Sequence, residues 1–248
     1  MAEKNSPIAG LKSGLTLYTQ PRLLIIFVMG FASGLPLALS SATLFFWLAE
    51  AGVTLTTIGL FALVGTPYNL KFLWAPFIDR VPLPLLSRLL GRRRSWMLVI
   101  QIGLMVSIAI LGFSQPEVTP VLTAASALAV AFFSASQDIV IDAYRIEILE
   151  SDEQGAGAAM TQAGYRLGAI LAGAGALFLA EVLDWSWVYA MMAALVVVGM
   201  AAAIFAPDPE KEPRHWRVPM QPMAYAPWSL IRLSNFFSAI PSLLQLSF

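Results

Sequence analysis

The stretch Leu23–Trp47, LLIIFVMGFASGLPLALSSATLFFW, contains no charged residue and decides the fold. A helix crosses the hydrocarbon core of a bilayer with roughly 20 predominantly apolar residues, so this stretch is long enough to span it. Lys4, Lys12 and Arg22 precede it, as basic residues precede a secretory signal. Its apolar run is too long for such a signal and further spans follow, so we predict a retained transmembrane helix.

Apolar stretches of the same kind recur along the chain, each ended by charged or turn-forming residues. Hydrophobic residues make up 58% of the chain and charged residues 12%, whereas a soluble domain is about 25% charged. The chain has no cysteine, which excludes disulfides and cysteine-based metal sites. We predict an all-α membrane protein with six transmembrane helices, Leu23–Trp47, Leu55–Ile78, Trp96–Phe113, Val121–Ile141, Ala156–Ala180 and Trp187–Phe205.

The basic residues between the predicted spans all lie on one side. The loops Leu48–Thr54, Ser114–Pro120 and Glu181–Ser186 contain acidic residues but no Lys or Arg. Lys and Arg stay on the cytoplasmic side of a membrane, so we predict that both termini face the cytoplasm. The basic residues on that side are Lys4, Lys12, Arg22, Arg80, Arg88, Arg92, Arg93, Arg94, Lys211, Arg214 and Arg217.

Small residues recur within two of the spans. Gly30 and Gly34, and again Gly164 and Gly168, have the spacing that lets helices approach closely. Pro36 lacks a backbone donor, so we predict a helix kink at Gly34 and Pro36. Two interpretations stay open: the small residues tighten packing, or they make a flexible segment that lines a cavity.

Four ionisable side chains lie inside the predicted spans, where a charge is expensive unless it meets a partner or a cavity. Lys71 lies about 16 residues into the second span and Arg166 about 10 residues into the fifth, which places both in the inner half of the bilayer. Asp138 and Asp142 lie at the same depth on the fourth span. Their i, i+4 spacing puts them on one helix face, and Arg145 follows on that face.

An aspartate in this layer can couple transport to protons. Burial raises the proton affinity of a carboxylate, and a neighbouring cation lowers it. An aspartate that is subject to both effects can bind and release a proton. We hypothesise that Asp138 or Asp142 is the proton-coupling carboxylate. Lys71 or Arg166 would then be its charge partner, or the anchor for an anionic substrate.

Each of these charges also has a structural interpretation. Asp142, Arg145 and Glu147 could mark the solvated cytoplasmic end of the fourth helix. The ammonium of Lys71 could reach the inner headgroups. Asp138 and Arg166 could form a structural ion pair between the fourth and fifth helices.

The loop after the second span holds a further charge pattern. Asp79 and Arg80 end that span, and Arg92, Arg93 and Arg94 precede the third. The order resembles the cytoplasmic loop of the major facilitator superfamily, in which an aspartate at a helix end pairs with basic residues and latches one conformation. The chain departs from that pattern because Ala75 stands in place of a glycine and Val81–Leu90 separates the acidic and basic parts. A basic inner loop also satisfies the positive-inside rule by itself.

Five runs of sequence carry a more specific resemblance. They are Gly30–Pro36 (GFASGLP), Thr57–Gly65 (TIGLFALVG), Leu70–Pro76 (LKFLWAP), Ser136–Arg145 (SQDIVIDAYR) and Gly164–Gly168 (GYRLG). Together they resemble the AmpG muropeptide permease family and, more weakly, the related acetyl-CoA transporters, from about Leu23 to Pro207.

The resemblance implies a proton-driven importer of anhydro-muropeptides in the bacterial inner membrane. Gln137, Tyr165 and Arg145 lie in the matching runs, so they join Lys71 and Arg166 as candidate substrate or charge-partner residues. Members of the family carry about twelve spans in two six-helix halves, so the fold expected here is one major-facilitator half-bundle.

The expected organisation is a cytoplasmic tail over residues 1–22, a six-helix half-bundle over 23–206, and a linker with a truncated or interfacial tail over 207–248. A substrate site between two repeats needs both repeats. The chain is therefore expected to be a half-transporter that needs a second half or a homodimer, or else a non-transporting fragment.

An enzyme is disfavoured by the absence of the usual chemical motifs. The single histidine, His215, lies in the tail, and no metal spacing, phosphate loop or nucleophile–base pair is present. We expect no cofactor, no metal and no nucleic acid. The expected partners are the lipid bilayer, protons and a small solute, either a muropeptide or another anion such as an acetyl-CoA-like compound.

Overall fold

The computed structural model describes residues 16–209. The chain divides into two units, Met1–Pro213 and Arg214–Phe248, and every described residue belongs to the first. The predicted tail over 210–248 and most of the predicted N-terminal tail therefore lie outside the described residues.

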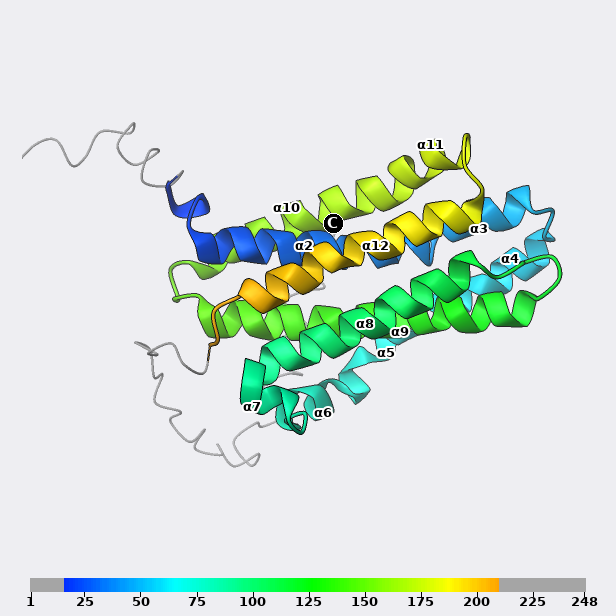
Figure 1. The fold of residues 1–248 in the computed structure, drawn as a ribbon. Coiled ribbons are helices and arrows are strands. Elements are labelled where there is room, and N and C mark those ends of the chain that lie inside the picture. The colour runs from blue at the N-terminus through cyan, green and yellow to red at the C-terminus, as the bar shows by residue number, and fades with distance from the viewer. Residues whose placement is uncertain (1–15, 210–248) are drawn as a thin grey trace, which may run out of the picture. The chain divides into compact units, whose positions relative to one another are not determined.

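Within residues 16–209 the regular structure is helical, as Figure 1 shows. Five segments are long and apolar enough to cross a membrane: Pro21–Glu50, Arg92–Gly112, Pro120–Ile148, Gln154–Ala180 and Trp185–Phe205. The first consists of α2 (Pro21–Leu39) and α3 (Ala42–Glu50), and the fourth of α10 (Gln154–Ile170), the π-helical turn η4 (Leu171–Gly175) and α11 (Ala176–Ala180). The other three are α8 (Arg92–Gly112), α9 (Pro120–Ile148) and α12 (Trp185–Phe205).

The second predicted span is broken rather than continuous. It consists of α4 (Leu55–Phe61), η2 (Ala62–Gly65), α5 (Thr66–Leu70), η3 (Lys71–Leu73) and α6 (Ala75–Arg80), with α7 (Leu86–Leu90) in the following loop. Pro67 and Pro76 stand in the first turns of α5 and α6. A proline cannot donate to the preceding turn, so each begins a new helical piece. The six-span fold is confirmed in outline, but the prediction of one continuous helix over Leu55–Ile78 is wrong.

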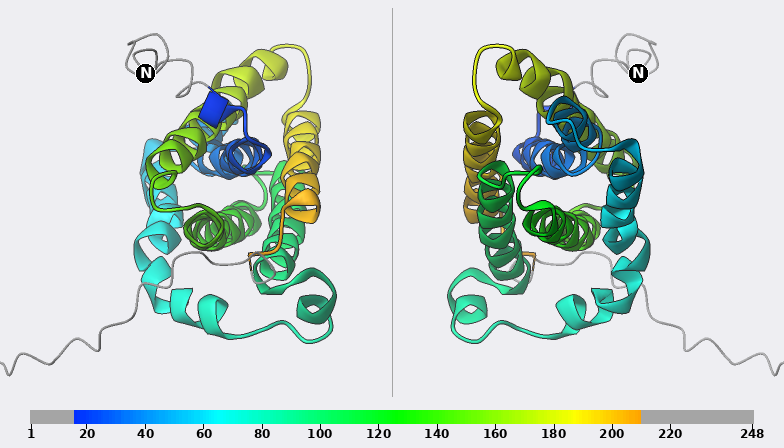
Figure 2. Two further views of the ribbon diagram at one scale, coloured as in Figure 1. Left: turned by 90° about the vertical axis from the view of Figure 1, so that its left-hand side faces the viewer. Right: turned by 90° about the vertical axis from the view of Figure 1, so that its right-hand side faces the viewer.

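The central helices of the bundle are α2 and α9. Figure 2 shows them in the middle, with the broken second span on one side and α8 and α12 on the other. The two buried apolar clusters join residues of the first span to α8, α9 and α12. The uncharged stretch Leu23–Trp47 is therefore packed on several sides, which fits the absence of charged residues within it.

The first span is interrupted later than we predicted. α2 remains helical through Gly34 and Pro36, where we predict a kink, and ends at Leu39. Ser40 and Ser41 separate it from α3. The interruption thus falls one helical turn beyond the proline.

α2 and α10 run side by side in close contact through their glycines. A methyl group on Gly30 or Gly34 would collide with the backbone of Thr161 or Tyr165 on α10. In return, a methyl on Gly164 would collide with the backbone of Phe27 on α2. Gly168 makes the same kind of approach to α2. The geometry supports the packing interpretation of these glycines.

We expect Gly164→Ala to destabilise the protein, because the added methyl meets backbone that cannot move aside. The loss should be about 1–3 kcal/mol, as for other overpacked sites. It can be measured by denaturant unfolding of the purified chain in detergent. Gly59→Ala is the matched control, because a methyl there meets nothing within 4 Å. Equal stabilities of the two variants would contradict the close helix contact.

Candidate functional site

The buried charge centre is built around Asp138, in the middle of α9. The Ser33 hydroxyl on α2 donates a hydrogen bond to Oδ1 of Asp138. The Nζ atom of Lys71 lies 3.9 Å from Oδ2. The Asp138 side chain is 23% exposed, so its charge is held mostly by these two groups. Three elements of the bundle therefore meet at one carboxylate.

The break in the second span determines where Lys71 lies. Lys71 opens the turn η3 between α5 and α6, beside the central helix α9. Close by, the indole nitrogen of Trp74 donates to the Ser136 hydroxyl on α9 over 3.0 Å. The broken span is thus tied to α9 by a hydrogen bond and an ion pair within a few residues.

Lys71, and not Arg166, is the partner of Asp138. The Arg166 side chain is exposed on α10 and makes no hydrogen bond or ion pair with another residue in 16–209. The alternative of an ion pair between Asp138 and Arg166 is therefore wrong. The Lys71 side chain remains 39% exposed, so the interpretation in which its ammonium reaches the inner headgroups stays a prediction. Helical spacing predicts the position of these charges along each helix, but it does not determine the direction in which each helix presents them.

Asp142 belongs to a different environment from Asp138. Its side chain is 57% exposed and lies 3.6 Å from Nη2 of Arg145, one helical turn later. α9 continues to Ile148, beyond the predicted end at Ile141, so both residues are helical. Of the three residues that we interpreted as a solvated helix end, Asp142 is largely exposed, whereas the side chains of Arg145 and Glu147 are only 18% and 17% exposed.

Two further predicted residues lie beside the charge centre. Gln137 is fully buried, and neither atom of its amide has a hydrogen-bond partner within residues 16–209. Tyr165 on α10 lies close enough to Asp138 for an electrostatic interaction. Ser33 is the member of this group that our sequence reasoning missed, because a serine among small residues resembles a packing residue.

A second charged cluster joins the end of the second span to the start of α8 and the end of α9, and Arg93 is its centre. The Arg93 side chain is 7% exposed, and its two terminal nitrogens lie 2.6 Å from Asp79 Oδ1 and 2.6 Å from Glu147 Oε1. Arg92 donates to the backbone oxygen of Asp79 and lies 3.8 Å from Glu147. The cluster therefore links the end of the second span, the start of α8 and the end of α9.

The other two arginines of the predicted loop lie outside this cluster. Arg94 donates to the backbone oxygens of Ala203 (3.0 Å) and Ile204 in the last turn of α12, where helix carbonyls lack partners within the helix. Arg80 is exposed and makes no ion pair within residues 16–209. Glu147 was not predicted as a partner, because sequence spacing does not show that the ends of α8 and α9 meet.

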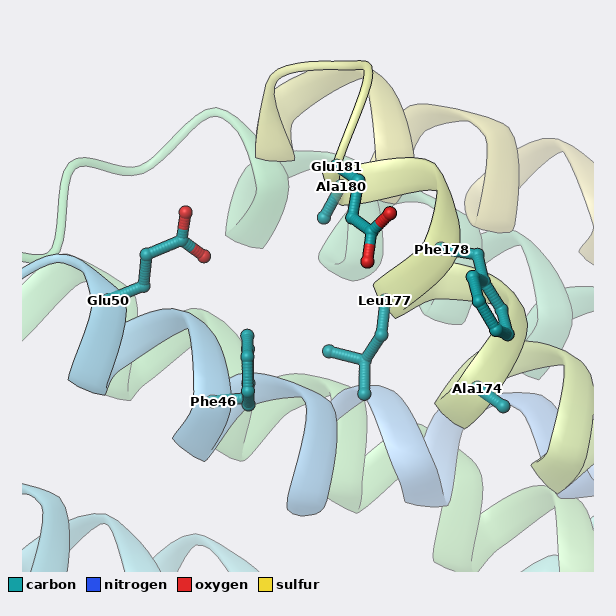
Figure 3. A pocket seen from close by; sticks show the side chains of 7 residues that line it. All are labelled: Phe46, Glu50, Ala174, Leu177, Phe178, Ala180 and Glu181. Atoms are coloured by element: carbon teal, nitrogen blue, oxygen red, sulfur yellow. The ribbon is translucent and has the colours of Figure 1, made fainter.

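A pocket opens at the opposite end of the bundle, between α3 and the η4–α11 segment (Figure 3). Its volume is about 590 Å³. Glu50 and Glu181 stand on its two sides, and the indole nitrogen of Trp185 donates to Glu50 over 3.1 Å. The rest of the lining is apolar: Phe46, Ala174, Leu177, Phe178 and Ala180.

No group of three or more His, Cys, Asp or Glu side chains within residues 16–209 has the arrangement of a metal site. The ionisable groups instead form pairs and small clusters of opposite charge.

Comparison with known proteins matches residues 21–248 to the Major Facilitator Superfamily. The anhydromuropeptide permease of Escherichia coli is 47% identical over 196 residues, which are 79% of this chain and 39% of that protein. The putative transporter AmpG 1 of Rickettsia conorii is 37% identical over 71% of this chain and 42% of its own. An uncharacterized protein of Haemophilus influenzae is 39% identical over 87% of this chain and 49% of its own. The chain thus spans about two-fifths to one half of the length of these relatives.

We expect Arg93→Ala to destabilise the bundle, because it leaves the mostly buried Glu147 carboxylate without its closest cation. Removing one partner of a buried pair costs about 3–5 kcal/mol, and about 2–4 kcal/mol is expected for this partly exposed cluster. Denaturant unfolding in detergent measures the loss. Arg88→Ala, an exposed arginine of α7, is the control and should change little. A loss no greater than that of the control would mean that the cluster does not hold the helix ends together.

Proposed function

The chain belongs to the major facilitator superfamily, and from this membership we propose that it forms the N-terminal half of a proton-coupled importer of anhydro-muropeptides. The proposal includes placement in the bacterial inner membrane. The identity to the Escherichia coli permease supports the solute. The observation that carries the coupling is the contact of Asp138 with Lys71 and Ser33 inside the bundle.

The Lys71–Asp138 pair provides a way for a proton and an anion to bind together. When Asp138 is ionised, its carboxylate neutralises the ammonium of Lys71. When a proton binds at the carboxylate, the pair loses its negative charge and the ammonium becomes available to an anionic group of the solute. Loss of the proton to the cytoplasm restores the pair and releases the solute.

Residues around the pair have supporting roles in this proposal. Gln137 offers an amide with unused donors and acceptors, and Tyr165 approaches Asp138 from α10. The Ser33 hydroxyl donates a hydrogen bond to Asp138, and in this proposal it supports the ionised carboxylate that re-forms the pair with Lys71.

The cytoplasmic cluster latches one conformation of the transporter. Arg93 binds carboxylates from the second span and from α9, so these helix ends can separate only when its ion pairs break. We place this cluster, and both termini, on the cytoplasmic side. The segregation of Lys and Arg in the sequence supports this orientation.

Transport requires a second set of helices, because a solute pathway between repeats needs both of them. A second copy of this chain or a separate second half would supply it. Without that partner the chain is a folded membrane protein that does not transport. Because Lys71 recognises negative charge alone, another anionic solute, such as an acetyl-CoA-like compound, is the alternative substrate.

We expect Asp138→Asn to abolish proton-driven accumulation of labelled anhydro-muropeptide in proteoliposomes, while exchange of labelled for unlabelled solute continues. The expected loss of accumulation is about tenfold or more, corresponding to at least about 1.4 kcal/mol. Asp142→Asn is the matched control, because Asp142 is largely exposed and pairs only with its neighbour within the described helix. It should retain accumulation close to that of the wild type.

Two results would contradict the proposal. One is accumulation by Asp138→Asn that equals that of Asp142→Asn, which would remove Asp138 from the coupling. The other is absence of uptake by the wild-type chain both alone and co-expressed with the C-terminal half of the Escherichia coli relative, which would remove the transport function itself.

A further inference from the structure

Two membrane-crossing segments are discontinuous at the same place in the bundle. The first span breaks at Ser40 and Ser41, between α2 and α3. The segment Gln154–Ala180 passes through the π-helical turn η4 between α10 and α11. The hydroxyl of Thr43, two residues after the first break, donates to the backbone oxygen of Ala172 in η4 over 2.8 Å. Thr43 is 1% exposed, so this hydrogen bond is buried and joins the two discontinuities directly.

The first break is a built feature whose carbonyls have donors. The Ser40 hydroxyl donates to Pro36 O over 2.8 Å. The Tyr189 hydroxyl of α12 donates to Leu39 O over 2.9 Å. An unpaired carbonyl in the hydrocarbon region costs several kcal/mol, so these donors allow the helix to stay interrupted.

The π-turn η4 is also an interruption in which a backbone carbonyl receives a hydrogen bond from another segment. A π-turn accommodates one extra residue and leaves the regular hydrogen-bond ladder, and such turns recur at functional positions. Thr43 supplies the donor to this turn from outside its own helix. A methyl group on Gly173, within the turn, would meet nothing within 4 Å. The turn is therefore held at Ala172, which is fully buried and accepts this hydrogen bond, and it has open space beside Gly173.

The two sides of these discontinuities are packed differently. On the cytoplasmic side, α2 and α10 interlock through Gly30, Gly34, Gly164 and Gly168, each against the backbone of the other helix. On the other side, α3 and α11 stand apart across the pocket of about 590 Å³ (Figure 3). One pair of segments is thus locked together and the other is separated.

We propose that α3 and α11 form a hinged outer gate that turns about the Thr43–Ala172 hydrogen bond, while α2 and α10 move as one body. Closing brings the apolar side chains Phe46 and Leu177, which line the pocket, into contact. Glu50 and Glu181 stand on opposite sides of the pocket, so the repulsion of their like charges opposes closing. The gate is a property of these helices and does not depend on which solute the bundle carries.

The hinge can be tested by distance measurements, because the chain has no cysteine to remove. Spin labels on Ala49→Cys and Val182→Cys report the outer segments, since both positions are exposed. Labels on Leu24→Cys and Gln162→Cys, also exposed, report the locked inner segments. Pulsed electron paramagnetic resonance on the chain in lipid nanodiscs gives the distance distribution of each pair.

Thr43→Val removes the hydroxyl donor and Thr43→Ser keeps it, so these two variants form the matched comparison. We expect the population of longer outer distances to be at least about twofold larger in Thr43→Val than in Thr43→Ser, with an unchanged inner distribution. Equal outer distributions in the two variants would overturn the hinge. So would an inner distribution that widens as much as the outer one, because Thr43 would then hold the whole bundle together.

If Thr43→Val does not fold, deletion of Gly173 provides a second test of the hinge. Deletion of Gly173 removes the extra residue of the π-turn and restores a regular helix. We expect the outer pair then to lose its longer distances, and persistence of these distances would contradict the hinge. Neither measurement needs transport, so a failed hinge and a failed transport function can be told apart.

Discussion

In the hydrocarbon region of a membrane no water reaches a backbone carbonyl, so every interruption of a helix in this bundle requires a donor from another group. At the end of α2 the hydroxyl of Tyr189 donates to Leu39 O. In the second span Thr66 donates to Leu63 O over 2.5 Å. These donors permit short helical pieces where continuous helices would otherwise be required. The position of Lys71 depends on these short pieces, because Lys71 is the first residue of the turn η3 between α5 and α6.

The charges of the bundle follow the same rule of compensation. Arg93 lies in the first turn of α8, where a positive charge is unfavourable because the N-terminal end of the helix dipole is also positive. It is nevertheless nearly buried, because Asp79 and Glu147 surround it. Asp138 is compensated more weakly, by one hydroxyl and one ammonium at 3.9 Å. The cluster around Arg93 is therefore the more strongly compensated of the two charged groups, and the pair at Asp138 is the weaker one.

The sequence predicted five of the six spans closely, because an apolar stretch of the right length is visible as a continuous run of residues. It did not predict that Lys71 rather than Arg166 would meet Asp138, because that depends on how each helix is rotated in the bundle. The breaks at Pro67 and Pro76 left a visible signal in the sequence, but the apolar run continues through both prolines and dominated our interpretation. The role of Glu147 required knowledge of which helix ends meet, which spacing alone does not contain.

Arg166 provides a physical argument for a partner surface beside α10. It lies within a membrane-crossing segment, is exposed, and makes no ion pair within residues 16–209. A guanidinium facing lipid at this depth costs several kcal/mol. The segment Gln154–Ala180 is also the least buried of the five segments long and apolar enough to cross a membrane within residues 16–209, at 22% compared with 44–61% for the others. A water-filled pathway or a second set of helices against this face would remove both costs.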